Sequence, residues 1–158
     1  MAKFSRVEIH KSEYIKASAS DLWAVITDWA GIERWWLTEA KGGRPGPGLL
    51  SCELIGTADI TPRTRRISLD NGSIVAETLL HENNQSRRIY YNMTPNAQVQ
   101  SYFATIFIDE VDQNSCILNV SSCFDVVPDV ADVDAVKSKF EATYEKALFN
   151  GLRAYFDK

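Results

Sequence analysis

The sequence predicts an α+β fold in which a curved antiparallel sheet of seven strands wraps around one long C-terminal helix, with two short helices after the first strand. Residues 132–158 place large rings and apolar side chains at helical spacing, with Phe140, Tyr144 and Leu148 four positions apart. Most of the preceding chain has the alternating pattern and turn residues of β-strands. A sheet closed by one helix encloses either a packed core or a cavity.

The composition indicates one domain over residues 1–158. The chain is 45% hydrophobic and 24% charged, which is enough apolar material for a sizeable core. A net charge of -4 argues against nucleic-acid binding, which is supplied by clustered Lys and Arg. No apolar run reaches the roughly 18 residues of a membrane helix, and the N-terminus has no apolar signal segment. We therefore expect no membrane insertion and a cytoplasmic location.

The first part of the chain predicts a strand followed by two short helices. Residues 7–16 alternate as an opening strand. Ser18 and Asp21 form a capping box, which predicts a helix of about three turns. Residues 28–31 are expected to break that helix, and residues 32–36 to form a second helical piece that ends in two tryptophans.

A loop rich in glycine and proline at residues 42–48 precedes the other strands. Asn71-Gly72 predicts a hairpin with a type I′ turn, in which both central residues need positive φ. Pro128 ends the last strand, and the acidic residues 129–134 suit the N-terminus of the closing helix. The six strands are expected at residues 49–56, 63–70, 73–81, 86–93, 99–112 and 116–127.

Three short motifs carry a resemblance to a known superfamily. Residues 17–28 (ASASDLWAVITD) resemble its "aspa-x-vW-x-x-x-x-D" motif, residues 70–77 (DNGSIVAE) resemble "dG-x-x-v-x-E", and residues 101–105 (SYFAT) resemble "n-Y-x-a-t". The chain thus resembles, over essentially its whole length, the helix-grip (SRPBCC) superfamily of START domains, the major birch pollen allergen, plant abscisic acid receptors and bacterial polyketide cyclase/dehydrase-type proteins. The resemblance implies a helix-grip fold that holds a ligand between sheet and helix.

Strand parity predicts which side chains face the C-terminal helix, because alternate residues of a strand point to the same side. In the abscisic acid receptors, the positions that resemble Glu77, Tyr102, Phe140, Tyr144 and Leu148 face the ligand, in agreement with this parity. The complete set of predicted ligand-binding residues is Arg65, Ile67, Leu69, Val75, Glu77, Leu79, Tyr91, Met93, Tyr102, Ala104, Ile106, Phe140, Tyr144 and Leu148.

Glu77 is the one carboxylate in this inward set. An ionised carboxylate among apolar side chains is costly unless it is paired or reaches water, and Arg65 on the same face is a candidate partner. Two interpretations remain open. The pair has no role in ligand binding, or Glu77 with Tyr91, Tyr102 and Tyr144 provides the few polar anchors of an apolar pocket.

For other polar and aromatic residues and for two loops, the sequence indicates a place at the pocket less directly. Asn119, Ser121 and Cys123 alternate with apolar residues on the last strand, so they face either the pocket or solvent. The loops at residues 69–73 and 94–98 occupy places where related proteins gate their pockets. The tryptophans are expected in the core and at the cavity rim: Trp23, Trp29, Trp35 and Trp36.

Three functions follow from this arrangement. The first is binding of a small hydrophobic ligand such as a lipid, a polyketide or an aromatic metabolite. The second is a cofactor-independent cyclase, dehydratase or isomerase that uses Glu77 as acid and base, with tyrosine hydroxyls orienting a carbonyl. The third is an accessory module that presents its surface to a protein partner, and its interior would be filled by side chains.

The sequence predicts neither a metal nor another cofactor. His10 and His81 are the only histidines, and neither has a carboxylate or thiol at a diagnostic spacing. Cys52, Cys116 and Cys123 lack the C-x-x-C spacing of zinc or redox sites and are expected as reduced thiols. Nothing in the sequence indicates an oligomeric state.

Overall fold

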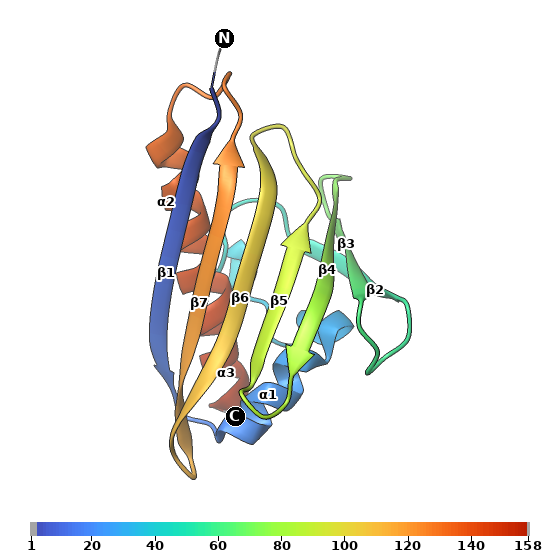
Figure 1. Cartoon of the computed structure of the whole chain (residues 1–158), viewed down its shortest axis with the longest axis vertical. Helices are drawn as coiled ribbons and strands as arrows, with labels where there is room; N and C mark the ends of the chain where they lie inside the picture. The colour runs from blue at the N-terminus through green and yellow to red at the C-terminus, as the bar shows by residue number, and fades with distance from the viewer. Residues whose placement is uncertain (1–2, 158) are drawn as a thin grey trace.

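The computed structural model describes residues 3–157 and confirms the predicted helix-grip architecture (Figure 1). The seven strands form one antiparallel sheet in the order β1-β7-β6-β5-β4-β3-β2. Their bounds are β1 Ser5–Ile15, β2 Leu49–Ile55, β3 Arg63–Leu69, β4 Ile74–Asn83, β5 Arg88–Met93, β6 Val99–Asp112 and β7 Ser115–Val126.

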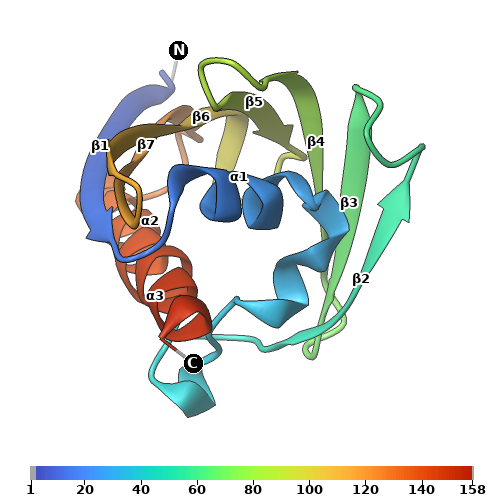
Figure 2. The ribbon, with the colours of Figure 1, turned by 90° about the horizontal axis from the view of Figure 1, so that it is seen from below.

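The helices lie on the concave side of this sheet. Figure 2 shows the strands curving around them, with α3 between the two edges of the sheet, beside β1 and near the start of β2. The helical segments are α1 Ala19–Thr27, the 3-10 helices η1 Trp29–Arg34 and η2 Glu39–Lys41, α2 Val133–Thr143, the π-helix η3 Tyr144–Phe149 and α3 Asn150–Phe156.

The predicted capping box is present at the start of α1, and α2 also has a side-chain cap. The Ser18 Oγ accepts a hydrogen bond from the Asp21 backbone N–H at 3.0 Å, so α1 begins where the capping box predicts. The Asp132 side chain accepts from the Ala135 N–H at 2.9 Å at the start of α2. Both caps satisfy backbone donors that have no partner inside the helix.

The C-terminal helix is continuous from Val133 to Phe156, but it is not uniformly α-helical. Its central segment, η3, is a π-helix that begins at Tyr144. The sequence did not indicate this turn, because the spacing of apolar residues is too coarse to separate α from π hydrogen bonding. The row that includes Phe140, Tyr144 and Leu148 nevertheless faces the sheet.

Two local predictions were wrong. The β3–β4 turn is not type I′, because only Gly72 has positive φ, at 87°. Its N–H donates to the Leu69 carbonyl at 3.0 Å, and the Leu69 N–H donates to the Ser73 carbonyl at 2.9 Å, as in a three-residue loop that ends in a left-handed glycine.

The second short helix begins earlier than expected, at Trp29 instead of Ile32. The predicted break is reduced to a single residue, Asp28, which ends α1. The side chain of Asp28 accepts from Arg34 at 2.5 Å, and its carbonyl accepts from the Gly31 N–H at 2.9 Å. These contacts bridge the ends of η1 and favour a helical path directly after Asp28.

Gly151 allows α3 to pack directly against the segment that follows η1. A Cβ built on Gly151 would overlap the backbone carbonyl oxygen of Trp35. Backbone atoms of this kind cannot rotate away, so any side chain here would push the helix from the segment that carries Trp35.

We expect Gly151→Ala to lower the free energy of unfolding by about 2–3 kcal/mol, as overpacking at a rigid contact does. Urea unfolding would measure the change. Ser138→Ala, on the exposed side of α2, should change stability by less than about 0.5 kcal/mol. A Gly151→Ala protein as stable as the wild type would contradict the close contact between α3 and the Trp35 backbone.

Candidate functional site

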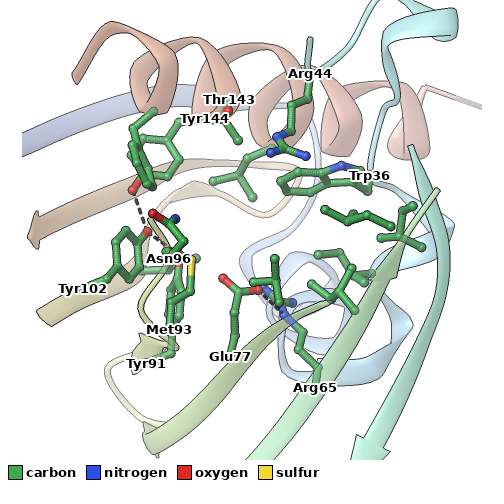
Figure 3. A pocket seen from close by; sticks show the side chains of 18 of the residues that line it. Trp36, Arg44, Arg65, Glu77, Tyr91, Met93, Asn96, Tyr102, Thr143 and Tyr144 are labelled. Carbon is green, nitrogen blue, oxygen red and sulfur yellow. Dashed lines mark hydrogen bonds and ion pairs between the residues drawn. The ribbon is translucent and has the colours of Figure 1, made fainter. Parts of the chain in front are cut away.

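A pocket lies between the sheet, the C-terminal helix and η1 (Figure 3). The space open to the centres of water-sized molecules is about 180 Å³. Most of the predicted ligand-binding residues meet here: Arg65, Ile67, Leu69, Val75, Glu77, Tyr91, Met93, Tyr102, Ile106, Phe140, Tyr144 and Leu148.

Leu79 and Ala104 do not line the pocket, although they were predicted to. They lie on either side of Tyr91 in the sheet, and both are fully buried, at 0% exposure. Parity placed these side chains on the inner face of the sheet, but it does not show whether neighbouring groups cover them. Leu79 and Ala104 belong to the core beside the pocket.

The predicted partner of Glu77 is confirmed. Arg65 and Glu77 pair directly across β3 and β4, and the Arg65 Nε donates to the Glu77 Oε1 at 2.8 Å. The side chains are 7% and 13% exposed, so water screens the pair only weakly. Figure 3 shows the Glu77 carboxylate between Arg65 and the open part of the pocket.

Trp29 joins this ion pair to η1. The Arg65 guanidinium carbon lies 3.6 Å from the centre of the Trp29 ring, a close cation–π contact. Arg65 also donates to the Trp29 carbonyl at 3.3 Å, and the Trp29 indole N–H donates to the Glu77 carbonyl at 2.9 Å. Each residue of this trio therefore contacts the other two, which fixes the position of the carboxylate.

A chain of hydroxyl groups crosses from the sheet to the helix. The Tyr144 hydroxyl donates to the Ser122 Oγ at 2.8 Å, and its oxygen lies 2.6 Å from the Tyr102 hydroxyl. The Tyr102 hydroxyl lies 3.2 Å from that of Tyr91. Because each phenol has one hydrogen, Tyr102 donates to Tyr144 and Tyr91 donates to Tyr102. The Tyr91 oxygen is left with capacity to accept.

All three phenols are held neutral by burial. Burial raises the pKa of Tyr91 and of Tyr102 far above the ordinary value, and raises the pKa of Tyr144 to about 12. The three side chains are nearly inaccessible to water. This end of the pocket therefore presents hydroxyl groups, not phenolates, at physiological pH.

Ser122 was not among the predicted site residues. The three polar residues considered on the same strand, Asn119, Ser121 and Cys123, face away from the pocket. Asn119 bonds to Ser12 at 2.6 Å and Ser121 to His10 at 2.9 Å, across the β1–β7 pair. Cys123 shares their parity. The sequence could have identified Ser122, because Ser122 alternates in phase with the apolar residues Leu118, Val120 and Phe124 and so lies on the inner face of the sheet.

Three of the tryptophans line the pocket, and Trp23 packs half-buried against the core, as expected. Trp29, Trp35 and Trp36 line the pocket, as expected for the core and rim. Trp23 instead donates to Asn84 at 2.9 Å, away from the pocket. The indole N–H of Trp35 is buried and has no hydrogen-bond partner within residues 3–157.

The rim contains polar residues that sequence parity did not identify. Arg44 comes from the glycine- and proline-rich loop, Asn96 and Gln98 from the loop between β5 and β6, and Lys139 and Thr143 from α2. Loop residues follow no alternation, and the helix positions lie beside the ring-bearing row. The resemblance had pointed to the loop at residues 94–98, which contains Asn96 and Gln98, but the sequence pattern gave no signal for Arg44, Lys139 and Thr143.

The described part of the chain offers no arrangement for a metal ion: residues 3–157 contain no cluster of three or more His, Cys, Asp or Glu side chains that would hold one. The three cysteines are unpaired with one another. No helix found between residues 3 and 157 has the length and apolar character needed to cross a membrane.

Comparison with known proteins gives one family and several structures. The family described as polyketide cyclase / dehydrase and lipid transport matches residues 6–157. No protein of curated function matches the chain. Similar solved structures include the protein XoxI from Bacillus cereus, with 22% identity, a TM-score of 0.73, and coverage of 96% of this chain and 96% of that chain.

Two further structures have the same fold. A START superfamily protein from Mycobacterium smegmatis is 16% identical, with a TM-score of 0.72 and coverage of 95% of this chain and 97% of the other. Norcoclaurine synthase from Thalictrum flavum, solved with dopamine and hydroxybenzaldehyde, is 18% identical, with a TM-score of 0.65 and coverage of 98% and 88%. At these identities the likeness concerns the fold alone.

The tyrosine chain predicts a loss of stability at alkaline pH. Tyr144 has a pKa of about 12 in the folded protein, against about 10 when unfolded. Its stabilising contribution is complete below about pH 10 and is lost as pH rises to about 12, because the unfolded chain releases the proton first. The free energy of unfolding of Tyr144→Phe should therefore fall by about 3 kcal/mol less than that of the wild type over this pH range, as measured by urea unfolding.

Tyr14→Phe is the matched control, because the Tyr14 side chain is 46% exposed. The free energy of unfolding of Tyr14→Phe should fall between about pH 10 and 12 by the same amount as that of the wild type. If Tyr144→Phe also shows the wild-type decline, the Tyr144 phenol is not held neutral by the fold.

Proposed function

The chain belongs to the polyketide cyclase / dehydrase and lipid transport family, and we propose that it binds a small, largely apolar ligand in the pocket between the sheet and the C-terminal helix. The observation that carries this proposal is an open space with apolar walls and a few fixed polar groups, the usual construction of a small-molecule site. The open space also disfavours a protein that acts only through its surface.

The walls suit a flat or chain-like apolar molecule. Tyr102 and Phe140 line the pocket with ring centroids 5.7 Å apart, and the fully buried Phe124, 4.5 Å from Phe140, supports them from outside the lining. Aromatic faces of this kind bury large areas of a planar ligand. The flexible thioether of Met93 can adjust to an irregular shape.

The polar anchors favour a ligand with hydroxyl groups. The Glu77 carboxylate and the Tyr91 oxygen both have acceptor capacity, and both residues line the pocket. A hydroxyl that donates to either group would be selected over a plain hydrocarbon. A hydroxylated lipid, a polyketide or a phenolic metabolite meets these requirements.

Filling the pocket should abolish binding of a neutral hydrophobic probe. Val75→Trp places a bulky ring in the pocket wall, and we expect the affinity for phenylnaphthylamine to fall by at least about tenfold. The fluorescence increase of the probe on binding gives the measurement. Ile74→Trp is the matched control, because Ile74 is the neighbouring residue, 51% exposed, and should retain wild-type affinity. Equal affinity of the two variants would refute binding in this pocket.

A second function, acid–base catalysis, is favoured by the position of Glu77. One carboxylate oxygen accepts from Arg65, and the carboxylate borders the open space. As a base, Glu77 would take a proton from carbon next to a ligand carbonyl. In an isomerisation it would return the proton to another carbon, in a cyclisation to the new alkoxide, and in a dehydration to the departing hydroxyl, which leaves as water.

Glu77→Gln separates binding from catalysis. The amide keeps the size of the side chain but cannot take up a proton, so probe affinity should remain within about threefold while catalysis is lost. Exchange of the hydrogens next to the carbonyl of tetralone, followed by proton NMR in D₂O, measures the proton transfer. Glu53→Gln, on the exposed side of β2, should exchange like the wild type. No acceleration by the wild type, or equal rates in Glu77→Gln, would exclude Glu77 as the base.

A further inference from the structure

The pocket contains more positive than negative side chains. Its charged lining residues are Arg44, Arg65, Glu77 and Lys139, a formal excess of two positive charges in a chain whose net charge is -4. Arg65 and Glu77 are paired at 2.8 Å. Arg44 and Lys139 have no carboxylate within 4.0 Å in the described residues 3–157. The excess charge therefore belongs to these two residues.

Arg44 is held in place by its backbone. Its N–H donates to the Leu37 carbonyl at 3.1 Å, and the adjacent Gly43 N–H donates to the Thr38 carbonyl at 2.8 Å. Further along the loop, the Gly46 N–H donates to the Glu39 carboxylate at 3.2 Å. Figure 3 shows the Arg44 guanidinium on the helix side of the pocket, beside Trp36. The loop thus directs a cation into the pocket.

The Arg44 guanidinium has little hydrogen bonding within the described chain. Its single contact there is a long bond of 3.5 Å to the Pro47 carbonyl, although a guanidinium has five N–H donors. The side chain is half-buried, and this burial lowers the pKa of Arg44 from its ordinary value. The attraction of the Glu77 carboxylate offsets only part of this burial cost, and an anion bound in the pocket would remove more of it.

A second unsatisfied donor lines the same pocket. The Trp35 side chain is 5% exposed, and its indole N–H is the one buried side-chain donor that lacks a partner among residues 3–157. Buried donors in folded proteins are nearly always satisfied, by protein, water or ligand. The indole nitrogen itself is closed off from water-sized molecules, so Arg44 is the residue that indicates a missing acceptor in the pocket.

We propose that the ligand is an amphipathic organic acid, whose carboxylate binds Arg44 and Lys139 at the rim while its apolar body fills the pocket. A guanidinium matches a carboxylate in shape and charge, which makes Arg44 the stronger of the two contacts. Lys139 is exposed and acts mainly through long-range attraction. This inference rests on the proposed ligand-binding function and narrows its ligand class.

Competition with bound phenylnaphthylamine tests the inference on the full chain. The competitors are two matched pairs, naphthoic acid with naphthalenemethanol and decanoic acid with decanol, at neutral pH. The wild type should bind each acid about tenfold more tightly than its alcohol, as expected for one charge-assisted contact. The pair that binds more tightly shows whether the apolar body is aromatic or a fatty chain.

Arg44→Gln should reduce the acid preference from about tenfold to the twofold to threefold that Lys139 supplies, and should weaken binding of the acids more than binding of the alcohols. Lys139→Gln should reduce it by about twofold to threefold. Arg66→Gln is the matched control, because Arg66 is exposed on β3 and does not line the pocket. Circular dichroism of each variant verifies that the fold is retained.

The outcomes separate this inference from the proposed function. If the wild type binds the probe but shows no acid preference, or if Arg44→Gln keeps the full preference, the proposal of an acid ligand is wrong. The proposal that the pocket binds a small ligand is unaffected by either result. Native mass spectrometry with the same four compounds gives an independent readout. A wild type that retains neither the probe nor any of these compounds refutes both proposals.

Discussion

The pocket depends on the buried ion pair between Arg65 and Glu77. Two charges taken out of water are tolerated only with close partners: here they pair with each other, the Arg65 guanidinium also contacts Trp29, and Trp29 bonds the backbone carbonyl of Glu77. These contacts connect β3, β4 and η1 at one point. Apolar side chains cannot pack over the free edge of such a pair without a large desolvation cost, so the space beside it remains open.

A second polar element holds the opposite end of the pocket. The hydroxyl chain from Tyr91 through Tyr102 and Tyr144 to Ser122 joins β5, β6 and β7 to the C-terminal helix. Each hydrogen bond has a preferred length, so the chain sets a distance between sheet and helix that apolar packing alone would not define. The family match and the structural likenesses describe the same scaffold, and these side chains give it a particular interior.

The sequence predicted those features that follow from periodicity. Alternation placed Arg65 opposite Glu77, and four-residue spacing placed Phe140 and Tyr144 over the sheet; contacts confirm the ion pair and the facing rings. Features without periodicity were not predicted. Arg44 reaches the pocket from an irregular loop, and its position depends on backbone hydrogen bonds of that loop to Leu37 and Thr38. Trp29 was expected only as a packing ring, because its bonds to the ion pair depend on where η1 begins.

The π-helical turn has a consequence for how the length of this helix can change. A π-helix closes wider hydrogen-bonded rings than an α-helix and commonly accommodates one additional residue. Such a turn spreads the additional residue over about the same total rotation as a regular α-helix, so losing one residue within Tyr144–Phe149 would restore α-helical geometry and leave Phe140 and Leu148 facing the same way. A single-residue deletion in the regular segment α2 would instead rotate the residues upstream of it by about 100°.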